Sequence, residues 1–251
     1  MGIDHPTLED IPALRRLWQE IFGDSDEFLD DFFRTGFSPR RCRCVTENGS
    51  LAAALYWFEC ELAGERLAYL YAVATARSFR GRGLCHALMA DTHALLEKQG
   101  FRGTVLVPGA SSLAALYGSM GYRYTTGIRE IFCTADPEPA ALRPVDAAEY
   151  ARLRRSMLPE GAVIQEGPAL EFLHTQARLY AGTHLLLAAR REGDDLFCLE
   201  LLGDASLAPR ILSALGCGRG RFRTPGEGRD FAMFRPLNDG KTPKYLGFAF
   251  D

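Results

Sequence analysis

The N-terminal segment carries apolar side chains at helical spacing. Thr7 and Asp10 form a helix-capping pattern, and apolar positions then recur every three to four residues until Gly23. This pattern predicts one amphipathic helix that ends at Gly23. Residues 28–33 are rich in phenylalanine and predict a second, short helix.

Beyond residue 40 the pattern changes to that of strands. Residues 42–46, 50–60 and 66–75 alternate in polarity or run apolar and β-branched, which predicts three strands. Asn48 and Gly49 are typical of a tight hairpin turn between the first two. A glycine-rich loop at 80–83, a helix over 84–98, a strand over 104–107, a helix over 111–119 and a strand over 122–133 are expected to follow.

A composition break at residues 135–139, with two prolines, is the best linker candidate. We therefore predict an α/β (α+β) protein with two domains, residues 1–135 and residues 140–251. Both halves run in the order helices, hairpin, helix and strands, which is compatible with a degenerate structural repeat. The second half is expected to hold a helix capped by Asp146, a helix over 168–181, a hairpin over 183–202, a helix near 206–215 and strands near 220–224, 230–235 and 245–250.

Composition places the chain among globular proteins, with 251 residues of which 47% are hydrophobic and 24% charged. A formal net charge of -3 argues against a non-specific nucleic-acid binder or a polybasic membrane-surface protein. No apolar run reaches the roughly 18 residues of a membrane helix, and we expect no secretory signal. Seven scattered cysteines without CxxC spacing indicate reduced thiols in a cytoplasmic protein rather than disulfides or a zinc site.

The loop between the third strand and the next helix carries the most informative chemistry. Its two glycines let main-chain N–H groups converge on an anion, and the first turn of the helix adds a partial positive charge. Arg80 and Arg82 supply side-chain charge. The residues alone fit a pyrophosphate cradle and an ordinary strand-to-helix connection about equally well.

Two other phosphate-binding loops are excluded by their spacing. A dinucleotide fingerprint needs a third glycine, and His86 stands in its place. Residues 240–242 imitate the end of a P-loop, but Arg235 replaces the first glycine and Pro243 prevents the helix that must follow.

Two motifs resemble the GNAT superfamily of acyl-CoA-dependent N-acyltransferases. The resemblance covers about residues 40–125 and implies a GNAT fold with a mixed central sheet, followed by a smaller C-terminal α/β domain. The first motif, similar to Q/R-x-x-G-x-G/A except in its last residue, is Arg80, Gly81, Arg82, Gly83, Leu84 and Cys85. The second, similar to the family's helix ending in lY…GF or GY, is Leu116, Tyr117, Gly118, Ser119, Met120, Gly121 and Tyr122.

Within the superfamily the chain is most similar to the enhanced-intracellular-survival-type acetyltransferases. Those proteins also lack the last small residue of the loop motif, which Cys85 replaces here. They carry a second, degenerate acyltransferase-like domain, which implies that residues 140–251 are a degenerate GNAT-like unit. Their third, sterol-carrier-like domain has no room in 251 residues.

The resemblance also implies roles for single residues. The strand edge at Val73, Ala74 and Thr75 would pair with the pantetheine amides of acetyl-CoA, and a main-chain N–H there would stabilise the oxyanion. Residues 80–85 would hold the pyrophosphate. Tyr117 would be the general acid that protonates the departing thiolate, since a phenol has a pKa near 10 and a thiol near 8.5. A buried strand, a solvated basic pair and a packed helix tyrosine are the structural alternatives.

The general base stays open. Glu59, Glu61, Glu130 and an ordered water are candidates, although each glutamate is also typical of a solvated strand. In the resembling subfamily a C-terminal carboxylate serves as base, which would assign that role to Asp251. A run of carboxylates after the first helix points to a cationic acceptor or to a solvated helix face: Asp24, Asp26, Glu27, Asp30 and Asp31.

The expected function is direct transfer of an acetyl group from acetyl-CoA, as co-substrate, to a primary amine of a small molecule or peptide. The reaction would use a ternary complex and no metal. The alternative is a catalytically weak acyl-CoA-binding sensor or interaction protein, which Cys85 favours and the Tyr117 motif disfavours. We expect a cytoplasmic protein without nucleic-acid or membrane partners, and leave a homo-oligomer open.

Overall fold

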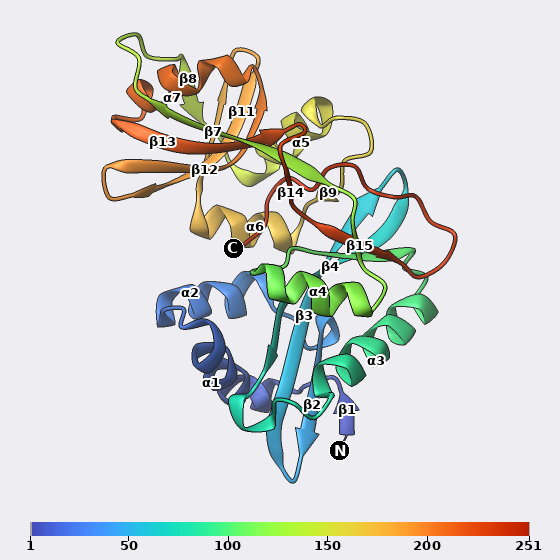
Figure 1. The fold of residues 1–251 in the computed structure, drawn as a ribbon. Helices are drawn as coiled ribbons and strands as arrows, with labels where there is room; N and C mark the ends of the chain where they lie inside the picture. The colour runs from blue at the N-terminus through green and yellow to red at the C-terminus, as the bar shows by residue number, and fades with distance from the viewer. Residues whose placement is uncertain (1, 251) are drawn as a thin grey trace.

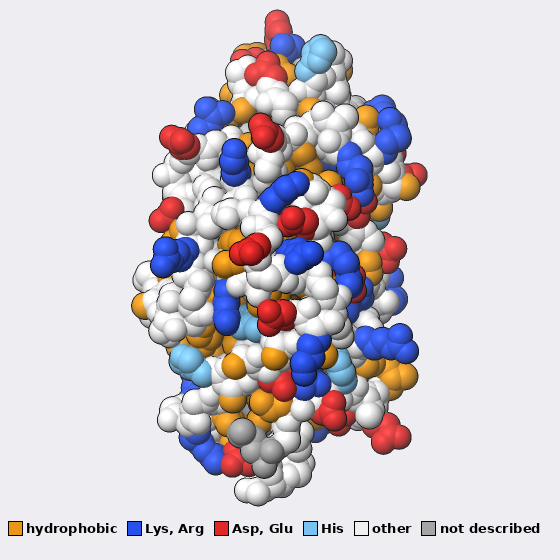
Figure 2. Space-filling view, turned by 90° about the vertical axis from the view of Figure 1, so that its right-hand side faces the viewer, with side chains coloured by type: hydrophobic (Ala, Val, Ile, Leu, Met, Phe, Trp, Pro, Cys, Tyr) orange, Lys and Arg blue, Asp and Glu red, His pale blue; other side chains and the backbone are white. Residues whose placement is uncertain are grey.

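The computed structural model describes residues 2–250 and contains two β-sheets with helices packed on them (Figure 1). The first sheet fills the lower part of the view and the second the upper part. A space-filling view of one side shows acidic and basic side chains interspersed rather than gathered by sign (Figure 2).

The first sheet is mixed, with the strand order β1-β2-β3-β4-β5-β15-β6 and with β9 paired to β3. Asn48 and Gly49 both have positive φ, 51° and 76°, and they form the predicted hairpin turn between β2 and β3. All pairs are antiparallel except that of β4 with β5. The strands are β1 (Gly2–Asp4), β2 (Cys42–Glu47), β3 (Ser50–Leu62), β4 (Glu65–Thr75), β5 (Gly103–Leu106), β6 (Arg123–Tyr124), β9 (Ile164–Gln165) and β15 (Met233–Pro236).

Alternation along β3 gives each face of this sheet its own apolar set. Tyr56 belongs to the cluster that packs with α1 and α2, whereas Trp57 belongs to the cluster that packs with α3 and α4. The helices therefore cover both faces. They are α1 (Ile11–Phe22), α2 (Asp26–Asp31), α3 (Leu84–Lys98) and α4 (Ser111–Ser119), with short helical turns η1 (Leu8–Asp10), η2 (Phe32–Gly36), η3 (Pro39–Arg41) and η4 (Arg77–Phe79).

The second sheet has the strand order β14-β7-β13-β12-β11-β10-β8. Helices α5 (Ala147–Met157) and α6 (Pro168–Gln176) pack with one apolar set, and α7 (Ala208–Ala214) packs with the other. A short turn, η5 (Ala205–Leu207), leads into α7. The strands are β7 (Gly127–Thr134), β8 (Leu142–Pro144), β10 (Arg178–Gly182), β11 (Leu185–Glu192), β12 (Asp195–Gly203), β13 (Arg219–Pro225) and β14 (Arg229–Asp230).

The two halves of the chain exchange strands. β7 precedes the predicted linker at 135–139, yet it lies in the second sheet between β14 and β13. β15 follows the whole second sheet in sequence, yet it returns to the first sheet between β5 and β6. The chain therefore crosses between the sheets both before and after the second half.

Four expected elements differ from those observed. The strand expected over 122–133 is two strands, β6 in the first sheet and β7 in the second. The strand expected near 230–235 is likewise divided between β14 of the second sheet and β15 of the first.

The helix expected over 168–181 ends at Gln176, and residues 178–182 form β10 because they pair with both β8 and β11. The strand expected over 245–250 is wrong: beyond a single bridge from Tyr245 to Ala162, the segment joins no sheet. The main-chain N–H of Val163 donates to the carbonyl of Tyr245, and beyond this residue side chains hold the segment. Gln165 donates to the carbonyl of Phe248, and Gly247 lies directly against Glu200.

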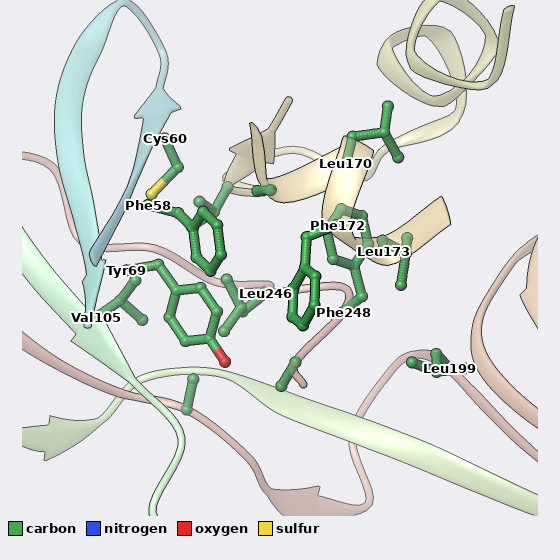
Figure 3. Close-up of a cluster of buried hydrophobic side chains, with 14 of the residues drawn as sticks. Phe58, Cys60, Tyr69, Val105, Leu170, Phe172, Leu173, Leu199, Leu246 and Phe248 are labelled. Atoms are coloured by element: carbon green, nitrogen blue, oxygen red, sulfur yellow. The ribbon is translucent and has the colours of Figure 1, made fainter. Parts of the chain in front are cut away.

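An aromatic cluster joins the two halves (Figure 3). Phe172 of α6 and Phe248 of the C-terminal segment lie near Phe58 of β3, and all three are buried. Phe250 packs beside them, with its ring centroid 4.9 Å from that of Phe172 and 5.3 Å from that of Phe58. Burying a phenylalanine contributes about 1.5–3 kcal/mol, so this cluster fixes the C-terminal segment firmly on the first sheet.

Candidate functional site

Strands β4 and β5 separate partway along their length. Within residues 2–250 they pair only from Leu67 to Tyr69 on the β4 side. On its other edge β4 carries a bulge, because Tyr71 pairs with Tyr56 and Ala74 with Ala54, which leaves Ala72 and Val73 together opposite one residue. Ala72 has a φ of 48°. The bulge redirects β4 at the point where its pairing with β5 stops.

A pocket of about 200 Å³ lies where the two strands diverge. Val73 and Tyr117, two of the predicted site residues, both line it. Ala74 and Thr75 lie just beyond and pair with Ala54 and Ala53 of β3. The other lining residues are Trp18, Phe22, Asp24, Tyr69, Leu70, Tyr71, Ala72, Leu106, Val107, Gly109, Leu113 and Phe250.

The glycine-rich loop has the backbone that an anion cradle requires. Gly81 and Gly83 both have a φ of 75°, in the left-handed region that favours glycine, and a Cβ at either would meet nothing within 4 Å. Gly83 is the N-cap of α3, so the first N–H groups of the helix have no acceptor within the helix. These features fit a phosphate group, which the loop would bind through main-chain N–H groups.

The two arginines of the loop differ in their surroundings. Arg82 forms an ion pair with Glu47 of β2, whose side chain is only 17% exposed. Arg80 is exposed and donates from Nε to the carbonyl of Thr75 at 3.3 Å. Arg80 is therefore the arginine whose charge is left for a ligand, a difference that the sequence did not indicate.

Cys85 turns inward from the loop. Its side chain is partly buried against the cluster that contains Tyr117, and burial raises the pKa of its thiol. The thiol is therefore protonated at neutral pH and packs beside α4 rather than on the outer side of the loop.

Tyr117 is buried at the C-terminal end of α4, with 7% of its surface exposed. Burial raises the pKa of its phenol, and the nearby Cys85 thiol adds to the effect. The phenol therefore keeps its proton at neutral pH and can donate it within the pocket. This geometry permits general-acid chemistry at the divergence of β4 and β5.

The glutamates considered as bases lie away from this pocket. Glu59 is exposed and pairs with Arg66 at 3.0 Å, Glu61 lies where β3 pairs with β9, and Glu130 is on β7 of the second sheet, paired with Arg229 at 3.0 Å. None of the three is among the lining residues. Asp251 lies outside the described residues.

Asp24 is the only carboxylate among the described residues that line the pocket. It accepts a hydrogen bond of 2.7 Å from Nε1 of Trp18, which fixes its side chain. Asp26 and Asp30 instead pair with Arg15 on the exposed side of the helices. The sequence placed Asp24 in an acidic run but could not separate it from its neighbours, because only the fold shows which member faces the pocket.

Within residues 2–250, no group of three or more His, Cys, Asp or Glu side chains is arranged to hold a metal ion. None of the helices in this range is both long and apolar enough to cross a membrane.

Comparison with known proteins bears on the family and on the fold. Residues 3–125 match the acetyltransferase (GNAT) domain family. No curated protein matches the sequence. Three similar solved structures each cover 94% of this chain: a GCN5-related N-acetyltransferase from Anabaena variabilis (TM-score 0.76, 17% identity, 73% of that chain), Eis1 from Mycobacterium abscessus (0.69, 14%, 74%) and a GCN5-related N-acetyltransferase from Kribbella flavida (0.69, 15%, 71%).

At these identities the likeness concerns the fold, and it extends over both sheets because it covers 94% of the chain. The predicted mixed α/β fold is confirmed, and so is the resemblance seen in the two motifs. Residues 3–125 are similar to the acetyltransferase (GNAT) domain family, the family that the two sequence motifs indicate.

Proposed function

We propose that this protein transfers an acetyl group from acetyl-CoA to a primary amine. The observation that carries the proposal is the shared pocket of Val73 and Tyr117, where a redirected strand edge and a buried, protonated phenol face the same space. The family supports acyl transfer in general, and this pocket is the place where donor and acceptor would meet.

Acetyl-CoA would bind along β4 and the following loop. The edge of β4 beyond its pairing with β5, at Val73, Ala74 and Thr75, would accept the extended pantetheine amides as an added strand. The pyrophosphate would bind at residues 80–85, held by the N-terminus of α3 and by Arg80.

The reaction would proceed by direct attack in a ternary complex. The neutral amine adds to the thioester carbonyl, and a main-chain N–H of β4 stabilises the resulting oxyanion. The C–S bond then breaks, and Tyr117 donates its proton to the CoA thiolate. The amine, which arrives as an ammonium, first gives one proton to a base, for which the proposed candidates are a water, Asp24 or Asp251. The second proton, which the nitrogen releases after attack, returns Tyr117 to its neutral form. Burial raises the pKa of Tyr117 and would likewise raise that of the CoA thiol, so the relative acidity of the two groups within the pocket governs this proton transfer.

The acceptor would be an amine that reaches the pocket as a cation. Asp24 offers a fixed negative charge, while Trp18, Tyr69, Tyr71 and Phe250 supply aromatic walls. Aromatic faces and a carboxylate together favour an ammonium group. We propose that the activity is cytoplasmic. We also propose that residues 1–135 contribute the acyltransferase domain and residues 140–251 the degenerate unit that walls the acceptor side, with β7 and β15 exchanged between the two.

The test begins with binding of acetyl-CoA, measured by calorimetry on the full chain and on Gly83→Glu. Micromolar binding that the glutamate abolishes supports the loop as the pyrophosphate site, because a carboxylate would then repel the phosphates. Absence of binding to the unmodified protein would refute the proposal. Gly100→Glu is the matched control for adding a charge, because Gly100 is an exposed glycine with a positive φ at the other end of α3.

Turnover is tested next with a panel of an aminoglycoside, a polyamine, an amino acid and a lysine peptide. Release of free CoA thiol is followed for the unmodified protein and for Tyr117→Phe. Loss of turnover in Tyr117→Phe with unchanged acetyl-CoA binding supports the general acid. Binding without turnover for every amine would favour the acyl-CoA sensor instead.

A further inference from the structure

A chain of four hydrogen-bonded side chains runs through the protein beside Tyr117. Arg235 of β15 donates from Nη1 to Nδ1 of His93 on α3. Nε2 of His93 lies 2.8 Å from Oη of Tyr122, which lies 2.7 Å from Oγ1 of Thr104 on β5. His93, Tyr122 and Thr104 are all buried. We refer to these four residues as the polar chain.

The direction of the hydrogen bonds at His93 follows from the first member of the polar chain. A guanidinium has only donors, so Nδ1 of His93 must accept and its proton must sit on Nε2. Nε2 then donates to Tyr122, and a further hydrogen bond joins the Tyr122 and Thr104 hydroxyls. Burial, together with the charge of Arg235, lowers the pKa of His93 to about 3, which keeps the ring neutral. The chain therefore holds the Tyr122 ring in one orientation.

Tyr122 is joined to Tyr117 in two ways. Its main-chain N–H donates to the carbonyl of Tyr117 at 3.1 Å, while the N–H of Gly121 donates to the carbonyl of Gly118. Gly121 has a φ of 89°, so α4 ends in a Schellman motif. The Tyr122 ring also packs against the Tyr117 ring, with centroids 5.9 Å apart and an interplanar angle of 64°. Orientation of one ring thus constrains the other.

The anchor of the polar chain comes from the second half of the sequence. Arg235 pairs with Thr104 across β15 and β5, and its side chain passes over Gly121. A Cβ on Gly121 would lie 3.7 Å from Nε of Arg235, so the arginine side chain lies beside the end of α4. Strand β15 therefore lies beside both Thr104 on β5 and Gly121 at the end of α4, through its residue Arg235.

We propose that Arg235, His93 and Tyr122 are positioning residues for Tyr117, and that the strand returned from the second half of the chain thereby orients the proposed general acid. The inference rests on the proposed function of Tyr117. It assigns a positioning role in catalysis to Arg235, which lies more than one hundred positions from the GNAT motifs in the sequence and is not among the residues that line the pocket.

The test uses Tyr122→Phe, which removes one hydroxyl and keeps the ring, and Arg235→Met, which keeps an apolar stem. Arg123→Met is the matched control, because Arg123 is an exposed arginine on β6 opposite β15. We expect kcat for the fastest amine of the panel to fall about tenfold in both variants, which corresponds to about 1.4 kcal/mol. The KM for acetyl-CoA should be unchanged, and Arg235→Lys should recover part of kcat.

A second readout does not depend on activity. Protein containing 3-fluorotyrosine gives a fluorine resonance for Tyr117, assigned by its loss in Tyr117→Phe. We expect this resonance to shift or broaden in Tyr122→Phe and Arg235→Met and to stay in place in Arg123→Met. If the Tyr117 resonance is unchanged in both Tyr122→Phe and Arg235→Met, the inference is overturned. This holds even when kcat and the melting temperature of these variants fall together.

The two proposals fail in different ways. If the Tyr117→Phe variant turns over at the rate of the unmodified protein, Tyr117 is not the general acid, and this inference fails with that proposal. If the Tyr117→Phe variant is inactive while Tyr122→Phe and Arg235→Met retain full kcat, only this inference is overturned.

Discussion

Arg154 and Glu200 form a bidentate ion pair in which both side chains are buried. Nε of Arg154 donates to Oε2 at 2.7 Å and Nη2 donates to Oε1 at 2.9 Å. The hydroxyls of Tyr150 and Tyr245 donate to the same carboxylate at 3.0 and 3.2 Å. Burial raises the pKa of both phenols, so they stay donors. The cluster joins α5, β12 and the C-terminal segment that carries Phe250 to the pocket.

Removal of one partner of this pair should destabilise the protein strongly. Glu200→Gln leaves the Arg154 guanidinium buried without its counter-charge, and breaking such a pair costs about 3–5 kcal/mol. Urea unfolding should show that loss, while the exposed pair of Arg155 and Glu166 provides the control. A Glu166→Gln variant should unfold at the same urea concentration as the unmodified protein. Equal midpoints for the two variants would contradict the prediction.

Asp24→Asn should weaken binding of the amine without affecting that of acetyl-CoA. Asp24 is the carboxylate that lines the pocket, and a hydrogen bond to a charged group contributes about 1.5–3 kcal/mol. The KM for the amine should therefore rise about tenfold or more. Asp26→Asn is the matched control, since Asp26 pairs with Arg15 away from the pocket. Steady-state kinetics in both substrates checks the prediction, which an equal effect of the two variants would refute.

The two loop arginines should contribute unequally to acetyl-CoA binding. Arg80→Ala should raise the Kd about tenfold because it removes a charge that is left for phosphate. Arg82→Ala should have a smaller effect, since Arg82 is paired with Glu47. Glu47→Gln should tighten binding by releasing Arg82. Calorimetry at two salt concentrations measures the Kd of acetyl-CoA for the three variants. A larger loss of affinity in Arg82→Ala than in Arg80→Ala would contradict the prediction.

His93 should make the protein less stable in acid. Its pKa is lowered from 6.5 to about 3 in the folded state, chiefly by burial, so the unfolded chain binds the extra proton first. The contribution to stability is complete above pH 6.5 and is lost as the pH falls toward 3, with an upper bound of about 5 kcal/mol. Urea unfolding of the protein and of His93→Gln from pH 7 to pH 4 checks this. The glutamine variant should lose less stability over that range, and parallel slopes would contradict the assignment.

The local pattern of apolar and polar residues predicted the elements between residues 42 and 98 well. The helix expected over 84–98 begins at Leu84 and ends at Lys98, because a left-handed glycine precedes it and its apolar positions follow a helical period. The three strands before it were also placed within a few residues. These elements depend on neighbours close in sequence, which a sequence displays directly.

The features that the sequence did not show depend on distant partners. The segment at 245–250 looks like a strand because it is apolar, yet it packs on Glu200 and Phe172 rather than on another strand. The sequence also cannot show that Asp24, among the carboxylates near it, lines the pocket, or that Arg82 pairs with Glu47. Both relationships depend on how the chain folds. No local pattern encodes which side chains meet across the pocket.

The return of β15 to the first sheet has a consequence for synthesis of the chain. During translation, residues 3–125 leave the ribosome long before residues 233–236, so β5 first folds with one edge unpaired. The aromatic ring of Phe234 that would cover Gly103 is also still missing at that stage. We therefore expect the sheet that holds the pocket to close only at the end of synthesis, with the nascent first half relying on chaperones to protect its open strand edge.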